Sequence, residues 1–280
     1  FILTHAVEQV DLPEIEQVRK FLPTYEPRQV LDPENPISIG AMVGPEAFTE
    51  VRYLAHHKQM QALELIPQVQ EEFKAVFGRD SGGLVRPYRC EDAETIVVAL
   101  GSIVGTIKDV VDERREVGDK IGVLSICSFR PFPIDAVREV LKGAKRTVCF
   151  EKAFSVGIGG IVSSHLRAAM RGKPFTCFEV IGGLGGRNIT KNSLHQMLDQ
   201  AEAETLEGLT FLDLDMELVN AELEREAKMR RSGGVADNVM RHAVQRADAA
   251  IAAQGEKPQA DKVGNARVAA PSTADTAINV

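Results

Sequence analysis

The sequence has 280 residues and a mass of 30.6 kDa, a length that suits one large domain or two ordinary ones, each with its own core. Hydrophobic residues make up 44% and charged residues 26% of the chain, which is the composition of a globular protein rather than a fibrous or disordered one. The net charge of −7 gives no general attraction to nucleic acid, and no apolar run approaches the roughly 20 residues that a membrane span requires.

The first 46 residues contain six prolines and predict an extended arm rather than an independent fold. The chain opens with Phe1 and shows neither an initiator Met nor a signal-peptide pattern, which we interpret as a start within a longer sequence. Over residues 46–77, apolar residues recur every three to four positions. This spacing predicts a helix, and the pair Gly82 and Gly83 is expected to end that segment.

From Tyr88 onward, short apolar segments alternate with amphipathic ones. The predicted elements are strand 95–100, helix 105–116, strand 121–126, helix 134–142, strand 146–150, helix 158–171, strand 175–181 and helix 192–203. Glycine stands shortly after each of the first three helices, where it can end a helix in the left-handed conformation. This alternation is typical of a parallel sheet covered by helices, so we predict an α/β fold.

Residues 206–280 are predicted to form a tail. A charged amphipathic helix is expected over residues 216–231 and a weaker helix over residues 235–253. The segment from Gln254 is rich in Ala, Pro, Thr and Asn and has little to bury. We therefore expect it to be disordered in isolation or to lie on a partner.

Two glycine-rich loops follow predicted strands, one over residues 157–160 and one over residues 182–188. In an open parallel sheet, the loops at the carboxyl ends of the strands line the ligand site, and their backbone N–H groups can approach an anion. In the second loop, the candidate residues are Gly183, Gly185, Gly186 and Arg187, since an arginine could add a bidentate contact to phosphate. Two interpretations stay open, a phosphate or coenzyme A contact and a loop that packs against a neighbouring subunit.

The remaining candidates favour ordinary structural roles. His56 and His57 lie on a charged helical stretch without a third ligand, and the carboxylates of residues 91–94 precede a strand, where a solvated turn is expected. The lone His5 in the arm is expected to make a structural hydrogen bond. Ser102 and Ser155 lack the G-x-S-x-G pattern of an activated serine. We predict no catalytic residue and no metal ligand in this chain.

The four cysteines are far apart and include no C-x-x-C pair, which argues against a zinc or iron–sulfur site ligated by this chain alone. They are expected to be buried free thiols, as in a protein of the reducing cytoplasm.

A series of short motifs, taken in order, resembles the alpha subunit of the pyruvate:ferredoxin oxidoreductase (pyruvate synthase) family, within the 2-oxoacid:ferredoxin oxidoreductases. The motifs are FILTH at residues 1–5, LDPENP at 31–36, EDAE at 91–94, VALGS at 98–102, GTIK at 105–108, RPFP at 130–133 and GLGGRNIT at 183–190. The resemblance extends from Phe1 to about Gln200 and leaves the tail unmatched.

The resemblance implies a fold for each part of the chain. Residues 1–86 would be the C-terminal end of a domain that binds the pyrimidine of thiamine diphosphate, together with a connecting arm. Residues 87–205 would form a domain resembling the C-terminal domain of transketolase, and residues 206–280 would be the tail. The part of the family that carries the cofactor-activating glutamate would precede Phe1, so that residue has no counterpart here.

The resemblance also implies a function at the level of a complex. Such a complex converts a 2-oxoacid, with pyruvate favoured, and coenzyme A to acyl-CoA, CO2 and reduced ferredoxin, using thiamine diphosphate, Mg2+ and iron–sulfur clusters. The chain would be a mainly structural subunit, inactive alone, with beta, gamma and delta-type subunits and ferredoxin as partners. Two alternatives stay open, an assembly scaffold derived from this domain and a stand-alone module that binds coenzyme A or a nucleotide.

Overall fold

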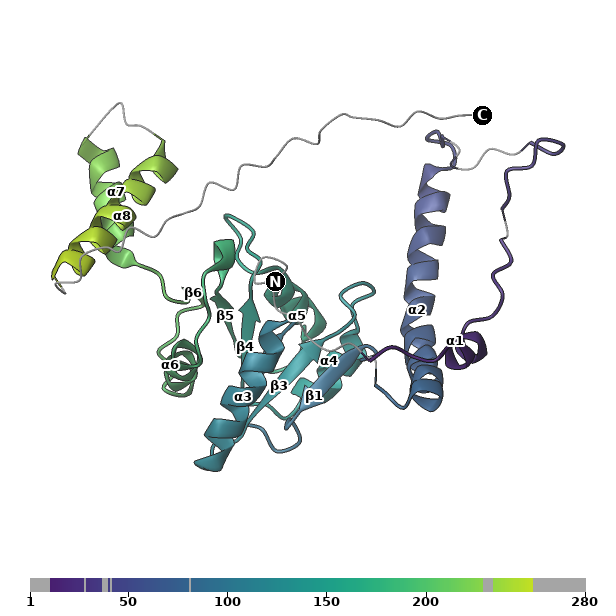
Figure 1. The fold of residues 1–280 in the computed structure, drawn as a ribbon, viewed down its shortest axis with the longest axis horizontal. Coiled ribbons are helices and arrows are strands. Elements are labelled where there is room, and N and C mark those ends of the chain that lie inside the picture. The colour runs from purple at the N-terminus through teal and green to yellow at the C-terminus, as the bar shows by residue number, and fades with distance from the viewer. Residues whose placement is uncertain are drawn as a thin grey trace, which may run out of the picture. The chain divides into compact units, whose positions relative to one another are not determined.

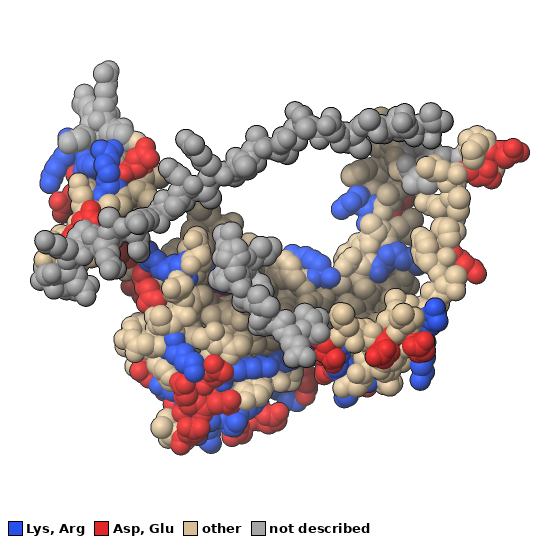
Figure 2. All heavy atoms as spheres, viewed as in Figure 1, with Lys and Arg blue, Asp and Glu red and all other residues tan. Residues whose placement is uncertain are grey.

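The computed structural model describes residues 11–27, 29–36, 40, 42–80, 82–228 and 234–253. The chain divides into two compact units, the first ending at Asp213 and the second beginning at Leu214. The FILTH motif with His5 and the tail from Gln254 lie outside the described residues. Among the helices that are described, none is long and apolar enough to cross a membrane. Figure 2 shows acidic and basic side chains mixed over the face in view, with no large surface of one sign.

A six-stranded sheet forms the centre of the first unit, in the order β1-β3-β2-β4-β5-β6 (Figure 1). The strands are β1 Val85–Tyr88, β2 Thr95–Ala99, β3 Ile121–Ile126, β4 Arg146–Glu151, β5 Cys177–Ile181 and β6 Leu209–Phe211. Strands β2 to β6 pair in parallel, which confirms the predicted α/β fold. At one edge the sheet is mixed, because β1, a strand that the sequence analysis did not include, pairs antiparallel with β3. Pro87 has no N–H to donate, and an edge strand tolerates that loss.

Two helices cover each face of the sheet, namely α3 Ile103–Glu116 and α6 Lys191–Glu202 on one side and α4 Ile134–Leu141 and α5 Ile161–Ala169 on the other. Successive residues of a strand point to opposite faces. Accordingly, Val97 packs in the core under α3 and α6, and Val98 packs in the core under α4 and α5. Burial on both faces explains why the central strands are continuous apolar runs.

Helix α5 begins three residues later than the sequence predicts. The preceding residues fold back as a tight turn instead, in which the N–H of Ser155 donates to the carbonyl oxygen of Gly159 at 2.8 Å. Gly157 and Gly159 have φ angles of +85° and +124°, which L-residues rarely adopt, so the turn depends on glycine.

Two helices precede the sheet, α1 Ile15–Phe21 and α2 Phe48–Phe77. Helix α2 was predicted, although it ends at the left-handed Gly78 rather than at Gly82 and Gly83. Helix α1 was not predicted, because the prolines around it indicated an extended arm. The Phe21 ring lies 5.5 Å from that of Phe73 and 5.4 Å from that of Phe77, so α1 covers the C-terminal end of α2.

The second unit contains α7 Met216–Lys228 and α8 Val235–Ala253, which pack together. Both were predicted, and residues 229–233 between them lie outside the described part. Arg246 of α8 holds the Asp215 carboxylate at 2.8 Å, and the same carboxylate accepts the N–H groups of Glu217 and Leu218 at the start of α7. These contacts tie the two helices to each other.

Candidate functional site

Strands β2 and β4 are neighbours at the centre of the sheet. After β2 the chain continues to β3 on one side, and after β4 it continues to β5 on the other side. Helices α3 and α5, which follow β2 and β4, cover opposite faces. In open α/β sheets, ligands bind at such a reversal of strand order. The loops after β2, β4 and β5 are therefore the first candidates for a functional site.

The loop before α5 is filled by two buried carboxylates of the protein itself, Glu151 and Glu179, which are 3% and 4% exposed. Glu151 accepts the N–H of Val162 at 2.6 Å and that of Ser163 at 2.9 Å. Glu179 accepts the N–H of Gly160 at 2.9 Å. These are the N–H groups that an external phosphate would need, so this glycine-rich loop does not bind one in the described conformation.

The glycines of that loop serve close packing. A Cβ at Gly159 would press on the Glu179 carboxylate, and a Cβ at Gly160 would clash with Glu151 Oε1. Burial opposes ionisation of Glu179, but the hydrogen bond from Gly160 and the ion pair with Arg167 outweigh it, so the pKa of this carboxyl lies below its usual value.

Reasoning from the sequence missed both carboxylates. The signal was present, because Glu151 follows three apolar residues at the end of its strand and Glu179 lies among apolar residues, where a charged side chain must find hydrogen-bond donors. What the local pattern did not reveal was the identity of those donors.

The loop after β5 contains Gly183, Gly185, Gly186 and Arg187 and has a different geometry. Gly183 and Gly185, with φ angles of +71° and +64°, flank Leu184 in a short 3-10 turn. Gly186 also has a positive φ of +83°, and the N–H groups of Gly186 and Arg187 donate to the carbonyl oxygens of Gly183 and Leu184 at 3.3 and 3.2 Å. Left-handed and right-handed residues in succession can turn their N–H groups toward one concave side, which is an arrangement that binds anions. A Cβ at Gly185 or Gly186 would meet nothing within 4 Å, so the outer side of the loop is open.

Two cationic side chains border this loop. Arg187 is exposed and its guanidinium donates to the carbonyl oxygen of Asp213. The side chain of Lys152, the first residue after β4, passes over Gly183, with Cε 3.0 Å from the position that a Cβ would take there. Among the described residues, Lys152 has no carboxylate partner. Lys152 was not among the predicted residues, although it follows the strand next to β5 and the carboxyl ends of adjacent parallel strands lie side by side.

The other candidate residues lie apart from this loop. His56 and His57 lie on exposed turns of α2, where the Tyr53 ring stacks on that of His57 at 6.4 Å. Asp92 pairs with Arg115 and Glu94 with Lys145, each at 2.7 Å or less, so this acidic cluster is a set of surface ion pairs. Within the described part of the chain, no three His, Cys, Asp or Glu side chains form a group that could hold a metal ion.

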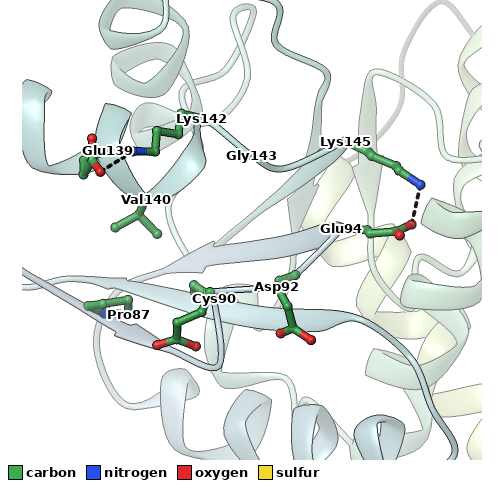
Figure 3. Close-up of a pocket in the computed structure, with 11 residues that line it drawn as sticks. Pro87, Cys90, Asp92, Glu94, Glu139, Val140, Lys142, Gly143 and Lys145 are labelled. Atoms are coloured by element: carbon green, nitrogen blue, oxygen red, sulfur yellow. Dashed lines mark hydrogen bonds and ion pairs between the residues drawn. The ribbon is translucent and has the colours of Figure 1, made fainter.

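A cavity of about 530 Å3 lies at the other end of the sheet, around the connections that lead into β2 and β4 (Figure 3). Four of its charged side chains form two ion pairs, Glu94 with Lys145 and Glu139 with Lys142. Burial raises the pKa of its one thiol, Cys90, to about 11, so this sulfur stays protonated and unreactive at neutral pH. Position and chemistry both separate the cavity from the loops at the carboxyl ends.

All four cysteines are free. Burial raises the pKa of the Cys149 thiol well above its usual value and that of Cys177 to about 12. The expectation that every thiol is buried holds fully only for Cys149, since Cys90 and Cys177 are half-buried and Cys127, just past β3, is exposed.

Comparison with known proteins connects this fold to one enzyme family. Residues 93–194 match the family described as pyruvate:ferredoxin oxidoreductase core domain II. The chain is 37% identical over 202 residues to pyruvate synthase subunit PorA of Methanothermobacter thermautotrophicus, covering 72% of this chain and 52% of the relative. It is 41% identical over 211 residues to PorA of Pyrococcus abyssi, covering 74% of this chain and 53% of the relative.

Another 2-oxoacid oxidoreductase subunit and a solved structure also match the chain, at lower sequence identity. Ketoisovalerate oxidoreductase subunit VorA of Pyrococcus horikoshii is 35% identical over 193 residues, covering 68% of this chain and 49% of the relative. A structure of 2-oxoglutarate:ferredoxin oxidoreductase from Magnetococcus marinus is 16% identical and covers 49% of this chain and 23% of that chain. Its TM-score of 0.35 is too low for a structural argument.

The chain spans about half the length of the curated relatives it matches. Several PorA subunits are nevertheless 37–41% identical to this chain over roughly three quarters of its length. The family model matches the segment from β2 to the first turn of α6. Over roughly three quarters of its length, the chain is therefore similar to subunits of 2-oxoacid:ferredoxin oxidoreductases, pyruvate synthase PorA among them.

Proposed function

We propose that this chain is a subunit component of a pyruvate:ferredoxin oxidoreductase, which converts pyruvate and coenzyme A to acetyl-CoA, CO2 and reduced ferredoxin. The observation that carries the proposal is the 37–41% identity to PorA subunits over 72–78% of the chain. Pyruvate is favoured over a branched 2-oxoacid because the VorA subunit matches at a lower 35%. The free thiols suit the reducing cytoplasm, where we place the complex.

Within such a complex, the chain contributes architecture. Among its described residues, no three His, Cys, Asp or Glu side chains form a group that could ligate Mg2+ or an iron–sulfur cluster. Thiamine diphosphate, which forms the reacting carbanion, and the clusters, which carry the electrons, then belong to other subunits or domains of the beta, gamma and delta type. Ferredoxin would accept the electrons from those parts.

The experiment that tests this proposal is reconstitution. Mixed with the remaining subunits, the chain should support pyruvate-dependent reduction of a viologen dye that also requires coenzyme A. Omission of the chain should abolish this activity, and the chain alone should have none. Full activity without the chain would instead favour the scaffold alternative, and activity of the chain alone would overturn the proposal.

For the loop of Gly183, Gly185, Gly186 and Arg187, we propose contact with a phosphate group of coenzyme A. The supporting features are the glycine-rich turn, its open outer side at Gly185 and Gly186, and the two cations Lys152 and Arg187. The loop before α5 provides a useful contrast, since there the protein's own carboxylates occupy the N–H groups. Among the described contacts, no carboxylate accepts an N–H group of the second loop, although the N–H groups of Gly186 and Arg187 donate to the carbonyl oxygens of Gly183 and Leu184.

Calorimetric titration with coenzyme A tests the loop directly. We expect binding by the wild-type chain, and a loss of at least about tenfold in affinity for Arg187→Ala and Lys152→Ala, since each removes a charge-assisted contact. The control is Lys142→Ala, at the other end of the sheet. If no variant changes the affinity but Arg187→Ala impairs assembly, the loop is a subunit contact.

A further inference from the structure

One side of helix α8 carries an apolar stripe that stays exposed. Met240, Val244 and Ile251 are 64%, 53% and 41% exposed, and Ala247 between them is exposed as well. At 3.6 residues per turn, these four positions fall within about 60° of arc on the helix surface. We call these four residues the α8 stripe. Toward the start of the helix, the stripe ends at the charged Asp237.

Helix α7 packs against a different side of α8, and Figure 1 shows the two helices side by side. Arg246 marks that side, since it pairs with Asp215 and Glu217 at the start of α7. The half-buried residues of α8 lie around Arg246 on the helix surface, namely Asn238, Val239, His242 and Ala243. This side is centred about 140° away from the α8 stripe. The contact between α7 and α8 therefore leaves the stripe uncovered.

The spacing within the α8 stripe is that of a coiled-coil seam. Its residues follow one another at intervals of four, three and four positions, which places Met240 and Ala247 at d and Val244 and Ile251 at a of a seven-residue repeat. Met240 and Val244 also line a groove of about 430 Å3 on this side of the helix. Most helical stability in proteins comes from packing such an apolar face, so the stripe suits a second helix.

The charged residues beside the stripe are complementary to a second copy of α8. Arg241 and Asp248 each follow a d residue and occupy the e positions on one flank, and both are exposed. Arg241 donates to the side-chain oxygen of Asn238 at 3.4 Å, and in the described part of the chain neither Arg241 nor Asp248 forms an ion pair. Each therefore has a free charge at the edge of the seam.

The orientation of the two copies follows from these charges. In an antiparallel pair, Met240 lies opposite Ile251 and Val244 opposite Ala247, and e positions face e positions. Arg241 of one copy then lies beside Asp248 of the other, and two-fold symmetry makes this ion pair twice. In a parallel pair, e positions face g positions, which are all alanines here, so both charges would stay unpaired; the g residues are Ala236, Ala243 and Ala250.

We propose that the α8 stripe pairs with the α8 stripe of a second copy of this chain, in antiparallel orientation. Two α7–α8 hairpins then meet along the seam, with α7 on the outer side of each. The inference goes beyond the proposed function, because it involves only the second compact unit and no residue of the sheet.

Sedimentation equilibrium of the purified chain tests the pairing. We expect a reversible dimer with a dissociation constant on the order of 10 µM, because a seam of two repeats buries less surface than a standard interface. Arg241→Asp and Asp248→Arg each place like charges opposite each other twice, and each should weaken the dimer by about tenfold or more. The double variant restores both ion pairs with their signs exchanged and should dimerise within about threefold of the wild type.

The control for this measurement is Glu226→Arg. It makes the same change in net charge as Asp248→Arg, at an exposed position of α7, and should leave the dissociation constant within about twofold of the wild type. A chain that stays monomeric at about 200 µM would overturn the inference. A dimer that is insensitive to the charge reversals, or a double variant that does not recover, would overturn it as well. Recovery by the double variant cannot come from unfolding, so a loss in the single variants is not mistaken for one.

Cysteine cross-linking tests the orientation. Met240→Cys and Ile251→Cys are made in separate, differently tagged chains that also carry Cys127→Ser, which removes the exposed native thiol. Antiparallel pairing places the two new thiols opposite each other, so a disulfide should form between the two chains when they are mixed and oxidised. Cross-linking of Met240→Cys to itself would indicate parallel helices and would overturn the inference. The absence of any cross-link between the mixed chains would do the same.

Discussion

The carboxylate of Glu151 is predicted to be a major local source of stability in the sheet unit. It is 3% exposed and accepts the N–H groups of Val162 and Ser163 at the start of α5. Glu151→Ala leaves both donors without this partner, and a buried donor without a partner costs about 1–3 kcal/mol. It also removes a negative charge from the positive end of the helix, worth about 0.3–1 kcal/mol. Allowing for partial entry of water, we expect a loss of about 2–4 kcal/mol, a large share of the 5–15 kcal/mol of a typical domain.

Urea unfolding at pH 7, followed by far-ultraviolet circular dichroism, measures this loss. Glu151→Gln keeps one acceptor oxygen and should lose about half as much. The control is Glu139→Ala on α4, where the carboxylate is exposed and pairs with Lys142, an arrangement worth at most about 1 kcal/mol. If Glu151→Ala stays within about 0.5 kcal/mol of the wild type, the capping role is refuted.

Three further predictions concern the same unit. The folded-state pKa of Glu179 lies below the unfolded value, so the stabilisation from its ionised carboxylate is complete above about pH 4.3 and is lost as the pH falls through the folded pKa. The difference in unfolding free energy between wild type and Glu179→Gln should therefore shrink from pH 6 to pH 3. A difference that stays constant over this range would contradict the lowered pKa. Gly160→Ala should lower the free energy of unfolding by at least about 2 kcal/mol, because its Cβ would clash with the Glu151 carboxylate that caps α5. Gly105→Ala on α3, where a Cβ meets open space, should raise it by about 0.5–1 kcal/mol in the same urea assay. A thiol reagent at pH 8 should modify Cys127 in the folded protein and Cys149 only after unfolding, and equal rates would contradict the described burial.

The elements of the fold were largely predictable because their signals are local. Apolar runs of strand length, helical spacing and glycine after the helices located four of the strands and their helices from nearby residues alone. The three elements that were not predicted, β1, β6 and α1, also have local explanations. Strands β1 and β6 are only four and three residues long, and Pro87 in β1 counted against a strand. Helix α1 has seven residues between prolines, too short for a periodic pattern to stand out.

The candidate site was predictable only in part. The four residues of the loop after β5 were identified by composition, and the structure brings them together in one turn. Lys152 was not identified, because it lies 31 positions before Gly183 along the chain and meets it only through the pairing of β4 with β5. Equally, nothing in the composition of the first glycine-rich loop indicated that it was already filled.

The sequence by itself determined the fold class and the resemblance to a family, because both depend on patterns and motifs along the chain. The tertiary structure decided which backbone N–H groups remain open to a ligand. Glu151 and Glu179 reach α5 and the turn before it across 11 and 19 positions, from strands that become neighbours only when the sheet forms. A glycine-rich loop is therefore an anion site only if no carboxylate of the protein reaches it first, and that depends on strand order rather than on the loop's own residues.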